Sequence, residues 1–95
     1  MKMIFVVADE GRSERVGREL LALGARGYTS MPVLEGVGHT GMHAGDRVHP
    51  GALVSFFAVA EDDVADQIFD GLVRCRDSAG DCITRLFLLP VERMA

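Results

Sequence analysis

Apolar runs and amphipathic segments alternate along this 95-residue chain. Runs rich in Ile, Val, Phe and Leu, bounded by Gly, Pro, Asp and Glu, predict strands at 2–8, 28–35, 52–60 and 82–91. Val16, Leu20 and Leu23 follow the i, i+4, i+7 spacing of one helix face. The polar residues at 9, 10 and 13 fit the start of that helix, and Gly24 with Gly27 supplies its stop.

A second helix is predicted after the third strand. The acidic residues at 61–63 suit a helix N-terminus, and one apolar face follows: Val64, Ala65, Ile68, Phe69 and Leu72. The resulting order is β-α-β-β-α-β, which predicts an α+β, ferredoxin-like sandwich. Right-handed crossovers place both helices on one face of a four-stranded antiparallel sheet. The length suits a single domain spanning 1–95.

The last two predicted strands lack the expected alternation. A strand covered on one face should alternate apolar and polar residues, whereas 53–59 and 86–89 are apolar almost throughout. Two helices cannot cover both faces of the sheet. We therefore expect another copy of the chain to bury the second face.

Composition narrows the classes of partner and the compartment. The net charge is −4 and no basic cluster occurs, which argues against nucleic acid as a partner. The apolar run at the start of the sequence is about six residues long, too short for membrane insertion or a secretory signal. A cytoplasmic protein is the expectation, with Cys75 and Cys82 reduced on either side of a predicted turn at 77–81.

The segment 36–51 is the chain's most unusual feature. It holds five of the eleven glycines and all three histidines. Its Gly36, Gly38 and Gly41 spell G-x-G-x-x-G, but the motif follows the second strand and precedes no helix, so a dinucleotide fold is not expected. Glycine amides that approach an anion closely and glycines that only form turns remain two open interpretations.

The histidines of this segment suggest a second chemistry. Neutral imidazole is a common ligand of divalent transition metals, so His39, His43 and His49 form a candidate metal site. Solvated histidines are the alternative, because neither cysteine partners nor the usual zinc spacings accompany them. No nucleophile, base and orienting group assemble in the sequence, so an enzyme is not expected.

Three segments carry a resemblance to a known family. Gly27-Tyr28-Thr29, the run Glu35-Gly-Val-Gly-His-Thr-Gly41 and the closing Leu86-Phe-Leu-Leu-Pro-Val91 resemble the PII signal-transduction proteins and their shorter PII-like relatives. The resemblance implies a homotrimer of ferredoxin-like subunits that binds adenine nucleotides in clefts between subunits. It also implies that 36–51 is a shortened T-loop, the effector arm of such proteins.

The resemblance further implies roles for individual residues. Thr29 would meet the adenine edge, and Arg85 stands where the family has a phosphate-binding lysine. A guanidinium can replace the ammonium there and contact phosphate bidentately. The residues expected along the ribose and phosphates are Gly36, Val37, Gly38 and His39.

The chain departs from the family in the segments that would determine which effector it binds. The family's Arg-x-Arg pair beyond the last strand is missing, and 78–81 is a shortened stand-in for its glycine-rich loop. These departures favour AMP, ADP, another anion or a divalent transition metal over ATP with 2-oxoglutarate. The predicted function is a regulatory protein that binds a small-molecule effector and signals through 36–51 to a target protein such as a transporter or an enzyme. The alternative is a CutA-like trimer that binds metal through its loop histidines.

Overall fold

The computed structural model describes residues 1–34, 37–38, 41–42, 52–79 and 83–95. Its main sheet has four strands: β1 (Lys2–Asp9), β2 (Thr29–Val33), β5 (Leu53–Ala60) and β6 (Ile83–Pro90). The helices are α1 (Ser13–Ala22), preceded by a 3-10 turn η1 (Glu10–Arg12), and α2 (Asp62–Ala79). Two further strands of two residues each are β3 (Val37–Gly38) and β4 (Gly41–Met42).

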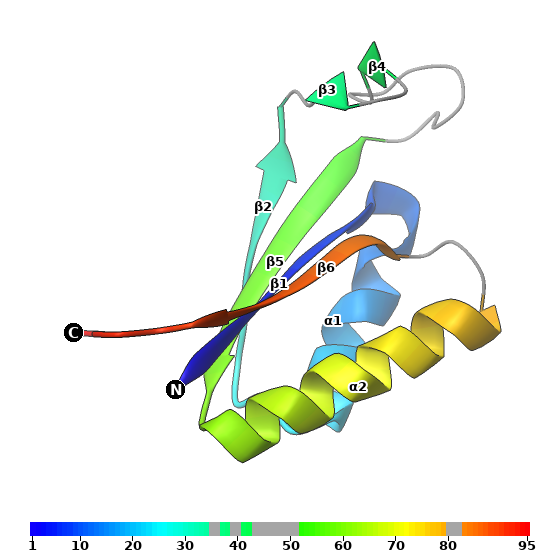
Figure 1. Cartoon of the computed structure of the whole chain (residues 1–95). Coiled ribbons are helices and arrows are strands. Elements are labelled where there is room, and N and C mark those ends of the chain that lie inside the picture. The colour runs from blue at the N-terminus through cyan, green and yellow to red at the C-terminus, as the bar shows by residue number, and fades with distance from the viewer. Residues whose placement is uncertain (35–36, 39–40, 43–51, 80–82) are drawn as a thin grey trace.

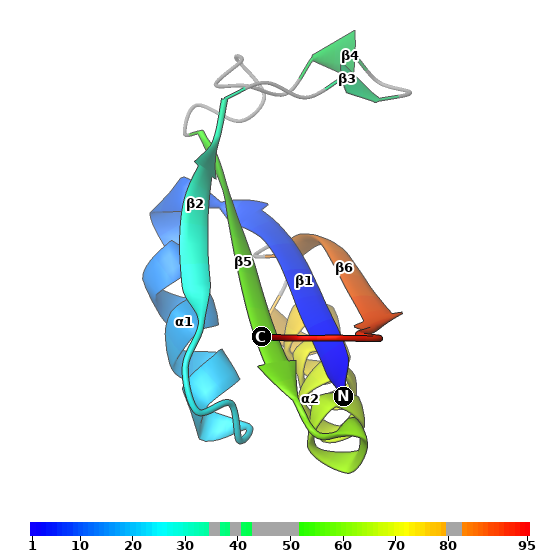
Figure 2. The ribbon, with the colours of Figure 1, turned by 90° about the vertical axis from the view of Figure 1, so that its left-hand side faces the viewer.

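The main sheet is antiparallel throughout, with the strand order β2-β5-β1-β6. Both helices lie on the same side of it (Figures 1 and 2). This arrangement confirms the predicted four-stranded fold with its helices on one face. It also places β2 at an edge, where the missing N–H of Pro32 is tolerated.

The core lies between the sheet and the two helices. Alternate residues of β1 (Ile4, Val6 and Ala8) are fully buried, as the two-residue period of a strand requires. The helices contribute the buried residues predicted from their spacing: Val16, Leu20, Ala65, Ile68 and Leu72. Each fully buried Leu or Ile of this set contributes about 1.5–3 kcal/mol of transfer free energy.

Helix α1 ends in a Schellman motif centred on Gly24. Its φ of +122° lies in the region that a side chain rarely adopts. The Gly24 N–H donates to the Leu21 carbonyl at 3.2 Å, and the Ala25 N–H donates to the Leu20 carbonyl at 3.0 Å. The glycine stop signal predicted at this position is therefore confirmed.

The end of α1 is held against the middle of α2. A Cβ atom added to Gly71 would lie 2.8 Å from Cδ1 and 3.1 Å from Cγ of Leu23. One turn earlier on α2, the Gln67 side-chain amide donates to the Leu23 carbonyl at 3.1 Å. The two helices approach closely here because Gly71 has no side chain.

The end of helix α2 and the segment 36–51 differ most from the sequence-based expectation, whereas the strand ends differ by one or two residues. Helix α2 continues to Ala79, through part of the turn predicted at 77–81. Propagating an existing helix adds a hydrogen bond for each residue fixed, which outweighs the weak turn preference of Asp and Ser. The segment expected to be a loop from 36 to 51 contains the paired strands β3 and β4, with Gly38 opposite Gly41.

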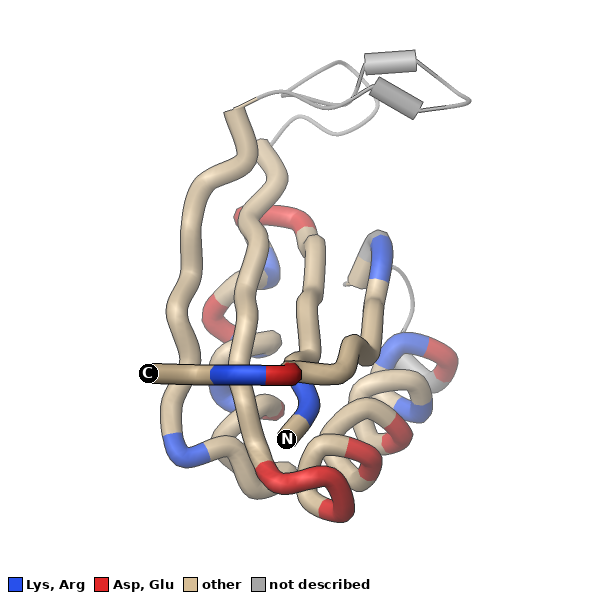
Figure 3. Tube along the Cα trace, turned by 60° about the vertical axis from the view of Figure 1, so that its left-hand side comes forward, with Lys and Arg blue, Asp and Glu red and all other residues tan. Residues whose placement is uncertain are grey.

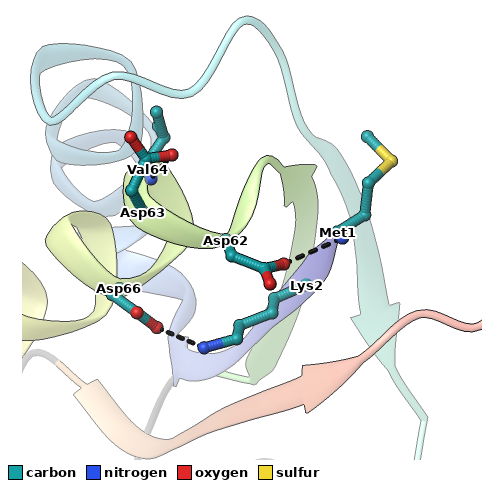
Figure 4. Close-up of polar contacts among 6 residues, drawn as sticks. All are labelled: Met1, Lys2, Asp62, Asp63, Val64 and Asp66. Atoms are coloured by element: carbon teal, nitrogen blue, oxygen red, sulfur yellow. Dashed lines mark hydrogen bonds and ion pairs between the residues drawn. The ribbon is translucent and has the colours of Figure 1, made fainter.

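Two ion pairs join the start of β1 to the first turns of α2 (Figure 4). The Met1 amino group lies 2.8 Å from Asp62, and the Lys2 ammonium lies 2.8 Å from Asp66. The hydrogen bond from the amino group lowers the pKa of Asp62 below its ordinary value. The hydrogen bond to Asp66 raises the pKa of Lys2 above its ordinary value.

We expect Gly71→Ala to lower the free energy of unfolding by about 1 kcal/mol. Alanine gains about 1 kcal/mol in helix propensity, but overpacking against Leu23 costs roughly 1–3 kcal/mol. Gly27→Ala is the matched control, because a Cβ there meets nothing within 4 Å. Urea unfolding of the three proteins measures the difference, and a Gly71→Ala variant more stable than the parent would contradict the close helix contact.

We expect the Lys2–Asp66 pair to stabilise the fold at neutral pH and to fail in strong alkali. Because the pKa of Lys2 is raised on folding, its contribution is complete below the unfolded-state value near 10.5 and disappears as pH rises through the folded value. Urea midpoints of the parent and Asp66→Asn should therefore converge above pH 10.5. Lys2→Arg should keep its advantage over the matching Asp66→Asn double variant there, because a guanidinium stays charged.

Candidate functional site

The side of the sheet that carries no helix is called the open face below. By the strand register, the residues that project from it come from all four strands: Met3, Phe5, Val7, Asp9, Thr29, Met31, Val33, Leu53, Ser55, Phe57, Val59, Arg85, Phe87 and Leu89. Most of these residues are apolar. Met31, Phe87 and Leu89 keep 42%, 47% and 42% of their surface exposed, so a large apolar area of this chain remains accessible to solvent.

Aromatic side chains occupy the centre of the open face. Phe5 of β1 lies directly opposite Phe57 of β5 on one side and Phe87 of β6 on the other. The rings of Phe5 and Phe87 are 6.3 Å apart between centroids and tilted by 57°. This geometry is typical of favourable aromatic pairs. The pattern agrees with the expectation that the second face of the sheet is apolar.

Thr29, the predicted adenine contact, is the first residue of β2. It is exposed and projects from the open face opposite Phe57. Its neighbour Tyr28 packs edge-on against Phe56, with ring centroids 5.5 Å apart, on the helix side. The Tyr28 hydroxyl also covers Gly17 of α1 so closely that a Cβ there would lie 2.5 Å from it. Tyr28 thereby fixes the point where β2 begins and Thr29 projects.

Arg85, the predicted phosphate contact, lies near the start of β6 and is exposed. It pairs with Val7 of β1 and so projects from the open face. A bulge between Val7 and Ala8 places one additional residue in β6, so that Ile83 faces the core while Arg85 faces the opposite way. Without this bulge the two residues, two positions apart, would share a face.

Thr29 and Arg85 therefore share the open face but not a site within one chain. Thr29 belongs to the edge strand β2, and Arg85 belongs to the opposite edge strand β6. Strands β5 and β1 lie between them, and three strand spacings amount to about 14 Å. A single group such as one base or one phosphate, held by one of these side chains in a single copy, is therefore out of reach of the other.

The glycine segment lies outside the main sheet. Strands β3 and β4 form a separate two-stranded ribbon beyond the ends of β2 and β5 (Figures 1 and 2). Val37 and Gly38, two of the predicted phosphate-side residues, form β3. Gly36 and His39 lie outside the described residues, as do His43 and His49. The metal site built on the three histidines therefore stays a prediction.

The charges are unevenly distributed over the fold. Basic residues gather where α2 ends and β6 begins, whereas acidic residues gather where α2 begins (Figure 3). The basic group consists of Arg74, Arg76 and Arg85, and Arg76 also contacts Asp77 at 3.3 Å. Of these three residues Arg85 alone projects from the open face, because α2 lies on the other side of the sheet.

A pocket lies at the opposite end of the sheet from Arg85. This pocket, of about 200 Å³, lies between the end of α1 and the start of α2. It is lined by Arg26, Glu61 and Val64 among others and contains none of the predicted site residues. Its opposite charges select neither an anion nor a cation.

Among the described residues, neither helix has the length together with the apolar composition that a membrane span requires.

One residue that positions the site was not singled out from the sequence. Ser55 is buried within β5, and its hydroxyl donates to the Met31 carbonyl of β2 at 3.1 Å. This bond reinforces the attachment of β2 to the sheet two residues beyond Thr29. The available signal was a lone serine inside an apolar strand, because buried hydroxyls in such surroundings find a partner.

The sequence of the chain also matches the model of a known protein family. The sequence model of the family "Nitrogen regulatory protein P-II" matches residues 1–95. This chain belongs to the P-II family. The resemblance read from the sequence is therefore confirmed. Among curated proteins no sequence matches significantly.

Solved structures of P-II and P-II-like proteins share the fold. CPII from Thiomonas intermedia K12, solved with ADP, AMP and bicarbonate, has a TM-score of 0.68 at 20% identity over 97% of this chain and 88% of its own. P-II from Arabidopsis thaliana, solved with citrate, has a TM-score of 0.67 at 21% identity over 95% of this chain and 76% of its own. A PII-like signalling protein from Thermus thermophilus has a TM-score of 0.65 at 21% identity, covering 92% of this chain and 81% of its own.

We expect Ser55→Ala to loosen β2 at the site. Loss of the bond to the Met31 carbonyl should cost about 0.5–1.5 kcal/mol. Amide hydrogen exchange should quicken in β2 more than in β1, because β1 keeps both neighbouring strands. Ser30→Ala, an exposed change on the same strand, is the control and should leave exchange unchanged. Equal exchange in β2 of both variants would show that the Ser55 bond does not hold the strand.

Proposed function

We propose that this P-II family member is a homotrimeric regulatory protein. In this proposal an adenine nucleotide such as ADP, AMP or ATP, or another small anion, binds in a cleft between two copies. The separation of Thr29 and Arg85 across the open face is the observation that carries it. Two copies that bring together β2 of one and β6 of the next would unite the two side chains on one ligand.

The apolar open face supports the assembly. Its centre is aromatic, and the exposed residues Met31, Phe87 and Leu89 lie on its two edge strands, β2 and β6. Burying such side chains contributes roughly 25 cal/mol for each Å² of apolar surface removed from water. A cyclic arrangement in which every copy both donates and receives the same surface closes on itself. Homotrimers are the arrangement that the family resemblance implies.

The binding chemistry follows from the residues at the two edges. The Thr29 hydroxyl can donate to and accept from the edge of an adenine base. The Arg85 guanidinium can hold a phosphate, or another oxyanion, through two parallel hydrogen bonds. The glycines of 36–38 allow backbone amides to approach the same anion. CPII, with ADP, AMP and bicarbonate, and Arabidopsis P-II, with citrate, are relatives whose ligands are anions of this kind.

Signalling in this proposal passes through the segment 36–51. This segment begins shortly after β2, so a ligand bound at its base would contact its first residues. A ligand that binds one arrangement of the segment more tightly increases the population of that arrangement. The favoured arrangement would then bind a target protein, such as a transporter or an enzyme. In this role the chain binds ligands and does not catalyse a reaction.

We expect calorimetric titration with ATP, ADP, AMP and cyclic nucleotides to detect binding of at least one of them. Arg85→Ala should weaken the affinity for the bound nucleotide by about tenfold to a hundredfold, because a hydrogen bond to a charged group is worth roughly 1.5–3 kcal/mol. Arg85→Lys should lose less, since the charge remains. Arg15→Ala, an exposed change on the helix layer, is the control and should bind normally. Absence of binding for all nucleotides at millimolar concentration would refute the nucleotide proposal.

A complementation experiment tests whether the site lies between copies. Thr29→Ala and Arg85→Ala should each bind weakly when assembled alone. In an equimolar mixture that assembles at random, about a quarter of all sites should regain tight binding, namely those where an intact Thr29 of one copy meets an intact Arg85 of the next. If one chain supplied both contacts, every site in the mixture would stay damaged and no binding would return.

A further inference from the structure

Beyond Pro90 the chain leaves the main sheet. Residues 91–95, called the arm below, extend away from the open face in Figure 1 and cross in front of β1 and β5 in Figure 2. The arm is held at its root, where the Val91 N–H donates to the Met1 carbonyl at 3.0 Å. Beyond this root, residues 92–95 are all exposed.

The arm does not cover the face from which it emerges. Phe87 and Leu89 remain 47% and 42% exposed with the arm in place, and Met94 on the arm is 63% exposed. Both the apolar surface of the sheet and the apolar side chain of the arm thus keep contact with water within one copy. Such surfaces gain free energy when another molecule covers them.

The reach of the arm decides what it can contact. Five extended residues span at most about 16–18 Å, whereas two packed sheets lie only about 10 Å apart. Any layer that packs on the open face therefore comes within reach of an arm directed away from that face. A second layer that packed on the open face without touching the arm would have to leave free the part of the face that the arm crosses.

We propose that the arm of each copy docks on the apolar surface of a neighbouring copy, as an exchanged segment that locks the assembly. This inference rests on the homotrimer of the proposed function and adds to it a specific contact between copies. A closed ring needs each copy to be donor and acceptor alike, and this chain carries both an arm and an open face.

The chemistry of the two surfaces suits a second copy of this chain. The arm contains one acid and one base, Glu92 and Arg93, and so brings no net side-chain charge to an apolar surface. Its Met94 is unbranched and flexible, which lets it fill an irregular apolar gap. On the open face, the charged residues Asp9 and Arg85 lie at the end of the sheet opposite to the root of the arm. The described open-face residues near the root of the arm, Met3, Val59 and Leu89, are apolar.

Removing residues 92–95 tests the contribution of the arm to assembly. The truncation leaves the sheet and the bond at Val91 intact, so the circular dichroism of the chain should not change. In analytical ultracentrifugation the concentration at which the assembly dissociates should rise at least tenfold, which for a trimer corresponds to about 2.7 kcal/mol for each assembly. Met94→Ala should reproduce part of the loss, and Met94→Leu, a conservative control, should restore most of it.

A photo-cross-link tests whether the contact joins two copies. The full-length chain carries a benzophenone amino acid at position 94 and is co-assembled with a large excess of ¹⁵N-labelled chain without the probe. After illumination, mass spectrometry should find the arm joined to ¹⁵N peptides from strands of the open face. Links confined to the arm's own chain would overturn the exchange.

The outcomes separate this inference from the function on which it rests. A full-length chain that sediments as a monomer contradicts the proposed assembly, and the arm exchange with it. An assembly that binds nucleotide normally and loses no stability on truncation overturns the arm exchange alone. An assembly weakened by truncation, with cross-links between copies, supports both.

Discussion

Both helices lie on one side of the sheet, and the rest of the molecule depends on this constraint. Because both crossovers are right-handed, both helices pack on the same face of the sheet, and the core forms between that face and the helices. The other face receives no cover from the helices of its own chain. The topology therefore leaves the apolar side chains of this face uncovered, and they provide the surface on which the proposed assembly is built.

The same sheet separates the two residues on which the proposed site depends. Thr29 and Arg85 lie on opposite edge strands, so the strand order that makes the single chain stable also makes its site incomplete. Small features set each position. Tyr28 fixes the start of β2, Ser55 reinforces its attachment, and the bulge in β6 turns Ile83 into the core while Arg85 stays on the open face. In this proposal ligand binding therefore depends on assembly, because only two neighbouring copies bring Thr29 and Arg85 to the same ligand.

Much of the fold could be predicted because its signals are local. The periodicity of Val16, Leu20 and Leu23 indicated the first helix, and Gly24 indicated its end, since a positive φ favours glycine. The signals failed where local preferences were weak. Turn residues near the end of α2 remained helical to Ala79, and two glycines of the expected loop pair across β3 and β4. The candidate residues came from family resemblance, because an exposed Thr or Arg carries no periodic signal.

The sequence by itself determined the order of elements, the sides of the helices that are buried and the membership of the P-II family. Only the tertiary structure decided which residues share a face and which edges they occupy. The physical reason is register: a shift of one residue in a strand, such as the bulge between Ile83 and Arg85, turns a side chain from one face of the sheet to the other, and here it places Ile83 in the core. Such a shift depends on contacts between strands distant in sequence, which a local pattern does not contain.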